Sequence, residues 1–125
     1  MVDPLLEVAP DGTASLVGGY SATSGMHHFP LGPICPYSGA EDVVEVTLPT
    51  TGRLWLWTAV TAAPPGYEGP IPYGFGIVEL DGIGLRVLGR LTEPDPAALS
   101  DGQAMRVVAE QLGDLQIWAF APVTR

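Results

Sequence analysis

The sequence has no lysine, and its five cationic residues are all arginines, set against fourteen acidic residues. The formal net charge is −9, and charged residues make up only 15% of the chain, compared with about 25% in typical globular proteins. A protein that binds nucleic acid depends on basic side chains, which displace the counterions of the phosphate backbone. The shortage of cations therefore argues against a nucleic-acid-binding role.

The low charge leaves a large apolar share, since 46% of the residues are hydrophobic. Two interpretations stay open for a chain of 125 residues, which corresponds to one domain with or without a small appendage. Either part of the apolar surface is covered by a permanent protein partner, or the apolar residues fill the interior of a compact β-barrel.

Membrane, export and disulfide signals are also missing. No apolar run reaches the roughly 18 residues of a membrane-spanning helix, and residues 1–10 lack the basic region and apolar core of a signal peptide. Cys35 is the only cysteine, which excludes an internal disulfide. Together these absences favour a cytoplasmic protein that does not bind membranes.

Residues 52–80 contain two apolar strands around which the rest of the chain is expected to fold. In the first strand, two sets of apolar residues alternate, so they are predicted to lie on opposite faces of a sheet. The sets are Leu54, Leu56 and Val60 on one face and Trp55, Trp57 and Ala59 on the other. A strand that is apolar on both faces must be covered on both faces.

The second strand and the loop before it carry glycine and proline. Glycines alternate with Tyr73, Phe75 and Ile77, which indicates tight curvature, or a backbone or ligand close to one face. The loop, residues 62–72, contains four prolines, two glycines and Tyr67. Because proline lacks a backbone donor and fixes φ, this segment is predicted to be neither helix nor central strand. It is unusually apolar for a solvated loop.

The remaining chain also consists of short apolar runs separated by turn residues. Strands are predicted at residues 14–20, 43–48, 85–91, 105–112 and 115–121, with a helical turn at 97–99 and an irregular arm or short helix at 1–12. Evenly spaced short strands predict an all-β fold, either a barrel or a sandwich. Five strands with one helical connection fit an oligonucleotide/oligosaccharide-binding (OB) barrel best.

Several short motifs follow one another in an order that is characteristic as a set. They are residues 21–25, Phe29-Pro30, residues 35–39, residues 52–58, residues 64–68, Pro72-Tyr73, residues 78–80 and residues 102–107. Their order and spacing resemble the acyl-CoA-associated OB-fold proteins that carry a rubredoxin-like zinc ribbon before the barrel. The resemblance implies an N-terminal arm and a zinc-ribbon-like hairpin at residues 1–40 and a five-stranded OB barrel at residues 41–125.

The resemblance also places the four zinc ligands of the ribbon at positions 21, 24, 35 and 38. Ser21, Ser24 and Ser38 stand at three of these positions, and only Cys35 remains. Structural zinc sites of this type need thiolate donors, and serine hydroxyls are poor ligands at neutral pH. We therefore expect no metal and no cofactor, and a degenerate ribbon held by packing and hydrogen bonds.

Two other interpretations of the ribbon stay open. His27 and His28 would form a three-ligand metal site with Cys35, although adjacent histidines on an extended segment tend to point apart. Cys35 with a nearby histidine would alternatively form a nucleophile–base pair. The simpler interpretation of Cys35 is a small buried residue left from an earlier metal site.

For function, the resemblance implies association with an enzyme. Relatives in this family are small partners of thiolase-superfamily enzymes, or domains fused to hydratase-like chains, in thiolytic or retro-aldol cleavage of acyl-CoA thioesters during steroid and aromatic degradation. We expect a non-catalytic accessory subunit of a hetero-oligomer whose larger partner holds the acyl-CoA. The residues expected to contact the partner or line its substrate channel are Trp55, Trp57, Pro65, Tyr67, Pro72, Tyr73 and Phe75, and Trp118 is expected in the core or the interface.

One rival interpretation is a small acyl-CoA thioesterase or hydratase. Such an enzyme needs a carboxylate or a histidine in a dry pocket. The candidates are Glu68, Glu79 and the His27–His28 pair, and the sequence shows no catalytic partner for any of them.

The other rival is a stand-alone acyl-CoA-binding module. Arg53, Arg86 and Arg90, with Arg106 as a further candidate, would then bind the phosphates of CoA. The simpler interpretation of each arginine is a solvated residue on the face of a strand.

Overall fold

The computed structural model describes residues 6–62, 65–67, 69 and 71–123, and almost all regular structure in them is β-strand. The elements are β1 (Leu6–Val8), β2 (Ala14–Ser21), β3 (Met26–His28), β4 (Val43–Thr47), β5 (Thr51–Val60), β6 (Tyr73–Leu80), β7 (Arg86–Leu91), the 3-10 turn η1 (Pro96–Ala98), β8 (Ala104–Leu112) and β9 (Leu115–Pro122). The all-β prediction is confirmed. Within these residues no helix is long and apolar enough to cross a membrane.

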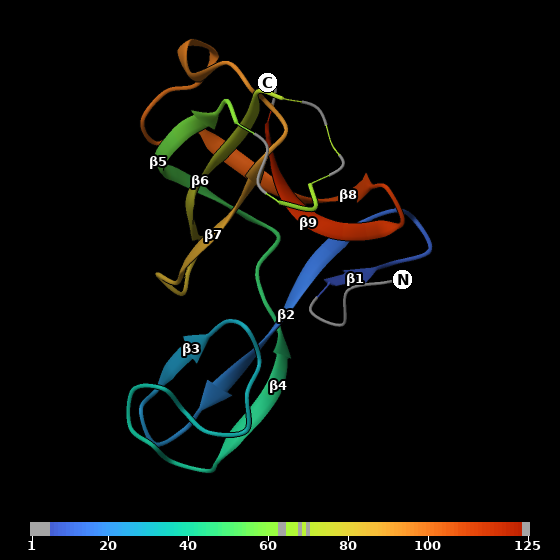
Figure 1. Cartoon of the computed structure of the whole chain (residues 1–125). Coiled ribbons are helices and arrows are strands. Elements are labelled where there is room, and N and C mark those ends of the chain that lie inside the picture. The colour runs from blue at the N-terminus through green and yellow to red at the C-terminus, as the bar shows by residue number, and fades with distance from the viewer. Residues whose placement is uncertain (1–5, 63–64, 68, 70, 124–125) are drawn as a thin grey trace.

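Five strands close into a barrel in the order β5-β6-β7-β9-β8, and β8 pairs back to β5 (Figure 1). Neighbouring strands are antiparallel except β7 and β9, which run parallel. The turn η1 lies between β7 and β8, where the Asp95 carboxylate accepts from the backbone N–H of Ala97 at 3.0 Å. This strand order and the position of the helical turn confirm the predicted OB barrel.

The N-terminal part forms a second sheet around β2, which pairs with β1, β3 and β4. In Figure 1, β2 runs from the side of the barrel into a separate lobe that contains β3 and β4. We refer to residues 19–47, which form this lobe, as the ribbon.

The N-terminal sheet corrects three predictions. Residues 6–8 form a strand rather than an irregular arm or a helix, and residues 1–5 lie outside the described residues. Residues 26–28 form a strand although the sequence pattern predicted none between residues 20 and 43. Residues 43–47, expected in the barrel, pair with β2 instead. In each case pairing with the central strand β2 decides the structure, and local sequence preference does not reveal it.

A single apolar core joins the two sheets. Leu16 of β2 is buried in the same cluster as Leu54 and Phe120 of the barrel. On the outside of this core, Phe29 of the ribbon packs edge-to-face on Trp118 of β9, with ring centroids 5.2 Å apart and planes at 85°. The ribbon is therefore packed against the barrel, and Trp118 is the barrel residue that Phe29 contacts.

The inner and outer faces of β5 and β6 follow the predicted alternation except at one place. On β6, a side chain at Gly76 would collide with the backbone oxygen of Leu56, so glycine permits the close approach that the pattern predicted. On β5, the register with β6 shifts between Leu54 and Leu56. This bulge leaves Leu54 1% exposed inside the barrel and Leu56 53% exposed outside. The prediction that both leucines share one face is therefore wrong.

Candidate functional site

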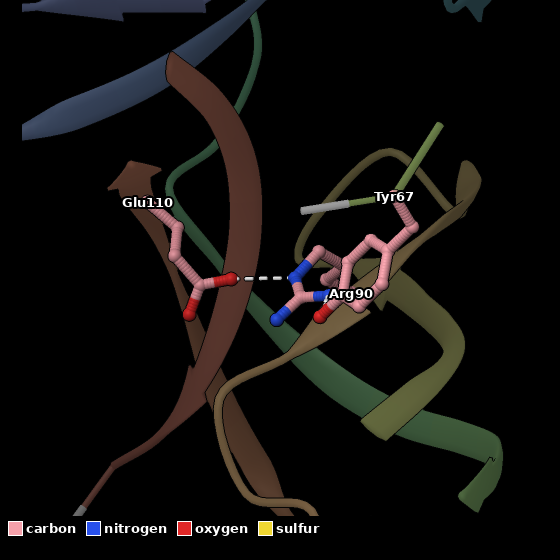
Figure 2. Close-up of polar contacts among 3 residues, drawn as sticks. All are labelled: Tyr67, Arg90 and Glu110. Atoms are coloured by element: carbon pink, nitrogen blue, oxygen red, sulfur yellow. Dashed lines mark hydrogen bonds and ion pairs between the residues drawn. The ribbon is translucent and has the colours of Figure 1, made fainter. Parts of the chain in front are cut away.

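Arg90 on β7 links the loop between β5 and β6 to the barrel wall (Figure 2). Its Nε donates to Oε1 of Glu110 on β8 at 2.6 Å, and its Nη1 donates to the hydroxyl oxygen of Tyr67 at 3.0 Å. The guanidinium also lies over the ring of Tyr73, 4.7 Å from the centroid. The Arg90 side chain is only 9% exposed, so this ion pair is largely removed from water.

The environment of Arg90 keeps it charged. Burial lowers the pKa of the guanidinium, but the hydrogen bonds to Glu110 and Tyr67 raise it further, and the net pKa lies above the ordinary value. The alternative that Arg90 is a solvated strand-face residue is therefore wrong, because its side chain is buried and paired.

The loop residues predicted to contact a partner lie beside this ion pair. Tyr67 and Tyr73 are half-buried with ring centroids 4.9 Å apart, and Phe75, also half-buried, pairs across the sheet with Arg90. Pro65 and Pro72 are exposed in the same loop. The aromatic residues and the described prolines thus lie at one end of the β6–β7 wall.

The two predicted tryptophans have different surroundings. Trp57 packs against the core, and its Nε1 donates to the backbone oxygen of Pro96 at 3.0 Å. It therefore fixes the turn η1 to the barrel. Trp55, at the bulge, is 44% exposed and lies under the guanidinium of Arg86, 3.9 Å from the ring centroid. Of the two, Trp55 offers more surface to a partner.

Two of the other candidate arginines, Arg53 and Arg86, lie at the opposite end of this wall. Arg53 and Arg86 flank Glu79 in one row across β5, β6 and β7. Arg86 pairs with Glu79 at 3.2 Å, and both side chains are about half exposed. Glu79, a candidate general base, is therefore engaged in a surface ion pair. Arg106 is exposed on β8, and the other carboxylate candidate, Glu68, lies outside the described residues.

The ribbon contains two similar turns at the four positions where relatives are expected to bind zinc. The backbone N–H of Gly25 donates to the backbone oxygen of Ser21 at 2.8 Å, and the backbone N–H of Gly39 donates to the backbone oxygen of Cys35 at 2.9 Å. Both glycines have positive φ, +68° and +76°, a conformation that glycine adopts without strain. The backbone therefore forms two matching loops even though three of the four side chains are hydroxyls.

These loops bring the side chains together. The Ser24 hydroxyl lies 3.4 Å from the Cys35 sulfur, and Cys35 is 1% exposed. Hydrogen bonds from Ser24 and then from Ser38 lower the pKa of the Cys35 thiol to about 6, against the opposing effect of burial. One thiol among three hydroxyls does not fit a structural zinc ion, which requires four nitrogen or sulfur donors. In this structure the contact between Ser24 and Cys35 joins the two loops instead.

The histidines do not join this cluster. Among the described residues, no three His, Cys, Asp or Glu side chains are placed to share a metal ion, so the alternative site of His27, His28 and Cys35 is not assembled. The ring of His27 lies against Tyr20, with centroids 4.9 Å apart. His28 is 4% exposed, and neither of its ring nitrogens has a hydrogen-bond partner within the described part of the chain.

Asp42 closes the first of the two loops. Its carboxylate accepts from the Ser21 hydroxyl at 2.6 Å, and from the Thr23 hydroxyl and backbone N–H at 2.8 and 2.9 Å. These hydrogen bonds lower the pKa of Asp42 from 3.8 to about 2, and the one from Ser21 has a larger effect than those from Thr23. The folded ribbon therefore favours the ionised form of this carboxylate.

This shift predicts a pH dependence of stability. Because the folded pKa lies below the unfolded one, the stabilisation is complete above about pH 4 and is lost as the pH falls through about 2. Asp42→Asn is expected to lower Tm at neutral pH and to flatten the decrease in Tm between about pH 4 and 2, measured by circular dichroism. Glu41→Gln, which removes the adjacent exposed carboxylate, serves as the control. An Asp42→Asn variant with the wild-type acid profile would contradict the prediction.

Sequence reasoning missed three residues of the barrel surface. Glu110 lies 20 positions from Arg90 along the chain, and no local signal connects them. Leu56 was assigned to the wrong face because of the bulge. Leu88, 53% exposed, stands midway between Arg86 and Arg90, and this period-2 spacing alone was sufficient to place it on their face.

Comparisons with known proteins agree with the fold. Residues 45–110 match the family described as ChsH2, C-terminal OB-fold domain. A DUF35 domain-containing scaffold protein of Pyrococcus furiosus is 32% identical over 97 residues, which cover 78% of this chain and 70% of that protein. A protein of the same description from Methanocaldococcus jannaschii is 26% identical over 98 residues, which cover 78% of this chain and 69% of that protein.

A solved structure supports the architecture. A chain of the Ltp2-ChsH2(DUF35) aldolase superposes with a TM-score of 0.72 at 24% sequence identity, over 88% of this chain and 86% of that chain. The likeness extends beyond the barrel, since it covers nearly the whole length of both chains. Together with the family match over half of the sequence and the 32% identical relative, it confirms the resemblance seen in the motifs: the chain belongs to the DUF35 family of ChsH2-type OB-fold proteins.

Proposed function

We propose that this chain is a non-catalytic accessory subunit of a thiolase-like enzyme of the aldolase or thiolase type. The observation that carries the proposal is the relationship, over 78% of the chain, to proteins described as scaffold proteins. The similar fold in an Ltp2-ChsH2(DUF35) aldolase points to an enzyme as the partner. The chain's role is to hold and shape the assembly.

The chemistry of the described residues supports a non-catalytic role. A general base needs a positioned partner and access to substrate. Glu79 is paired with Arg86 on the surface. His28 is buried, and its ring nitrogens have no hydrogen-bond partner among the described residues. The ring of His27 lies tilted against that of Tyr20. These positions argue against the alternative of a small thioesterase or hydratase.

The proposed function also includes the substrate of the partner enzyme and the cellular compartment. The partner is a thiolase-superfamily enzyme that cleaves acyl-CoA thioesters by thiolytic or retro-aldol chemistry, in steroid or aromatic side-chain degradation in the cytoplasm. The partner holds most of the acyl-CoA, because the candidate arginines of this chain do not converge. Arg53 and Arg86 share a row with Glu79, whereas Arg90 is buried and paired with Glu110.

The test is reconstitution from purified components. A tagged chain is used to capture proteins from the source cell, and a captured thiolase-like protein is then expressed and purified separately. We expect the two to form a complex of defined mass in size-exclusion chromatography with light scattering, and acyl-CoA cleavage to require the larger subunit. Turnover of an acyl-CoA by the isolated chain, or the absence of any complex with a thiolase-like protein, would contradict the proposal.

A further inference from the structure

An apolar row crosses the outer face of the β5–β6–β7 wall. Leu56, Ile77 and Leu88 are direct cross-strand partners, since Leu56 pairs with Ile77 and Ile77 pairs with Leu88. Leu56 and Leu88 are each 53% exposed. The bulge at Trp55 creates this row, because it turns Leu56 outward to meet the other two. Trp55, 44% exposed, stands beside the row on the same strand.

A pocket of about 260 Å³ adjoins the row between β6, β7 and β9. It is lined by Phe75, Leu88, Gly89, Arg90, Ile117 and Trp118. The pocket lies where β7 and β9 diverge, since the two strands pair only at Arg90↔Ala119 and Leu91↔Phe120. A groove of this kind receives a large apolar side chain of a partner, the usual anchor of a protein interface.

The charges around the row differ from those of the rest of the molecule. Arg53 and Arg86 lie at one end and the buried Arg90 at the other. Arg86 pairs with Glu79, Arg90 pairs with Glu110, and Arg53 lines a shallow pocket together with Asp101. The named cationic and acidic side chains therefore balance on this face, although the chain as a whole has a formal charge of −9. A protein with acidic groups around an apolar patch is therefore repelled less by this face than by the rest of the molecule.

We propose that this surface, the apolar strip formed by Trp55, Leu56, Phe75, Ile77 and Leu88 with its adjoining pocket, is the docking site for the enzyme subunit of the proposed function. The subunit inserts one large apolar side chain into the pocket and places carboxylates near Arg53 and Arg86. The strip is continuous with the loop at Tyr67, since Arg90 contributes to the pocket and also binds Tyr67. The inference rests on the proposed function and adds the face that is used.

The test compares aspartate substitutions of equal exposure on and off the strip. Leu88→Asp and Leu56→Asp place a charge on the strip, and Val44→Asp, 55% exposed on β4 in the ribbon, is the control. We expect the two strip variants to weaken binding of the purified enzyme subunit by at least about 30-fold, measured by interferometry. Val44→Asp is expected to stay within about twofold of wild type. Circular dichroism melts establish that each variant is folded, and Leu88→Asn replaces any variant that is not.

Each outcome distinguishes the inference from the function on which it rests. If strip variants bind the enzyme subunit as wild type does, the inference fails and the proposed function stands. If wild type binds no thiolase-like subunit, both fail. Two further results overturn the inference by showing another occupant: a dimer of the isolated chain that Leu88→Asp dissociates while enzyme binding is unchanged, or acyl-CoA binding to the isolated chain that Leu88→Asp abolishes.

Discussion

A variant with Ser21→Cys, Ser24→Cys and Ser38→Cys is expected to bind one zinc ion tightly, whereas the wild-type chain is not. The two ribbon loops already have the required backbone, with Gly25 and Gly39 donating to the oxygens of the first residue of each loop. A tetrahedral zinc ion with bonds of about 2.3 Å to sulfur holds its four sulfurs about 3.8 Å apart. The present separation of 3.4 Å between the Ser24 hydroxyl and the Cys35 sulfur is close to this value.

The expected effect is large because metal binding is coupled to folding. In small zinc-binding peptides, structural zinc contributes an apparent free energy of roughly 10–16 kcal/mol at neutral pH. Even a fraction of this free energy raises the Tm of a small domain by many degrees. The metal-free triple variant is expected to be less stable than wild type, since Ser21→Cys loses the 2.6 Å bond to Asp42. Zinc content after gel filtration and melts with and without EDTA measure both effects.

A fourth substitution provides the matched control. Adding Cys35→Ala to the triple variant keeps three thiols in the ribbon but removes the fourth donor, and zinc is expected to be lost to EDTA far more readily. If the triple variant purifies without zinc and is unaffected by the metal, the four positions do not lie at ligand distances. Equimolar zinc in purified wild-type protein would contradict the interpretation that hydrogen bonds have taken over the role of the metal.

The barrel was predictable from the sequence because its signals are local. Turn residues and period-2 alternation mark β5 to β9 individually, and the short turn between β7 and β8 is marked by Pro94 and Pro96 with Asp95 as its cap. The N-terminal sheet was less predictable. The strands β1 and β3 have three residues each, and such short segments become strands only because β2 offers backbone partners on its edges.

The candidate site was predictable in composition but not in arrangement. Tyr67, Tyr73 and Phe75 were selected from the apolar loop and the strand that follows it, and the structure brings them together around Arg90. A bulge is invisible in an alternating apolar pattern, so Leu56 was placed on the same face as Leu54. The pairing of Arg90 with Glu110 depends on the closure of the barrel, which brings β7 near β8 through β9. Such long-range contacts have no signature in a single sequence.

Glu110→Ala is expected to lower the free energy of unfolding by about 2–4 kcal/mol, because it leaves the Arg90 guanidinium buried without its counter-charge. The Arg90 side chain is 9% exposed, and its bond to Glu110 is 2.6 Å long. Arg90→Met removes the charge itself and keeps an apolar stem in contact with Tyr73, so a smaller loss is expected. The double variant Arg90→Met/Glu110→Leu is expected to recover part of the loss of Glu110→Ala. Urea denaturation of all three variants measures the coupling.

The surface pair of Arg86 and Glu79 supplies a matched control, since it joins the same two residue types on neighbouring strands at 3.2 Å with both side chains about half exposed. Glu79→Ala is expected to cost at most about 1 kcal/mol. Tyr67→Phe, which removes the hydroxyl that accepts from Arg90, is expected to cost about 1 kcal/mol and to speed proteolytic cleavage in the loop between β5 and β6. If Glu110→Ala costs no more than Glu79→Ala, then burial adds nothing to this ion pair, and Arg90 does not hold the loop against the barrel.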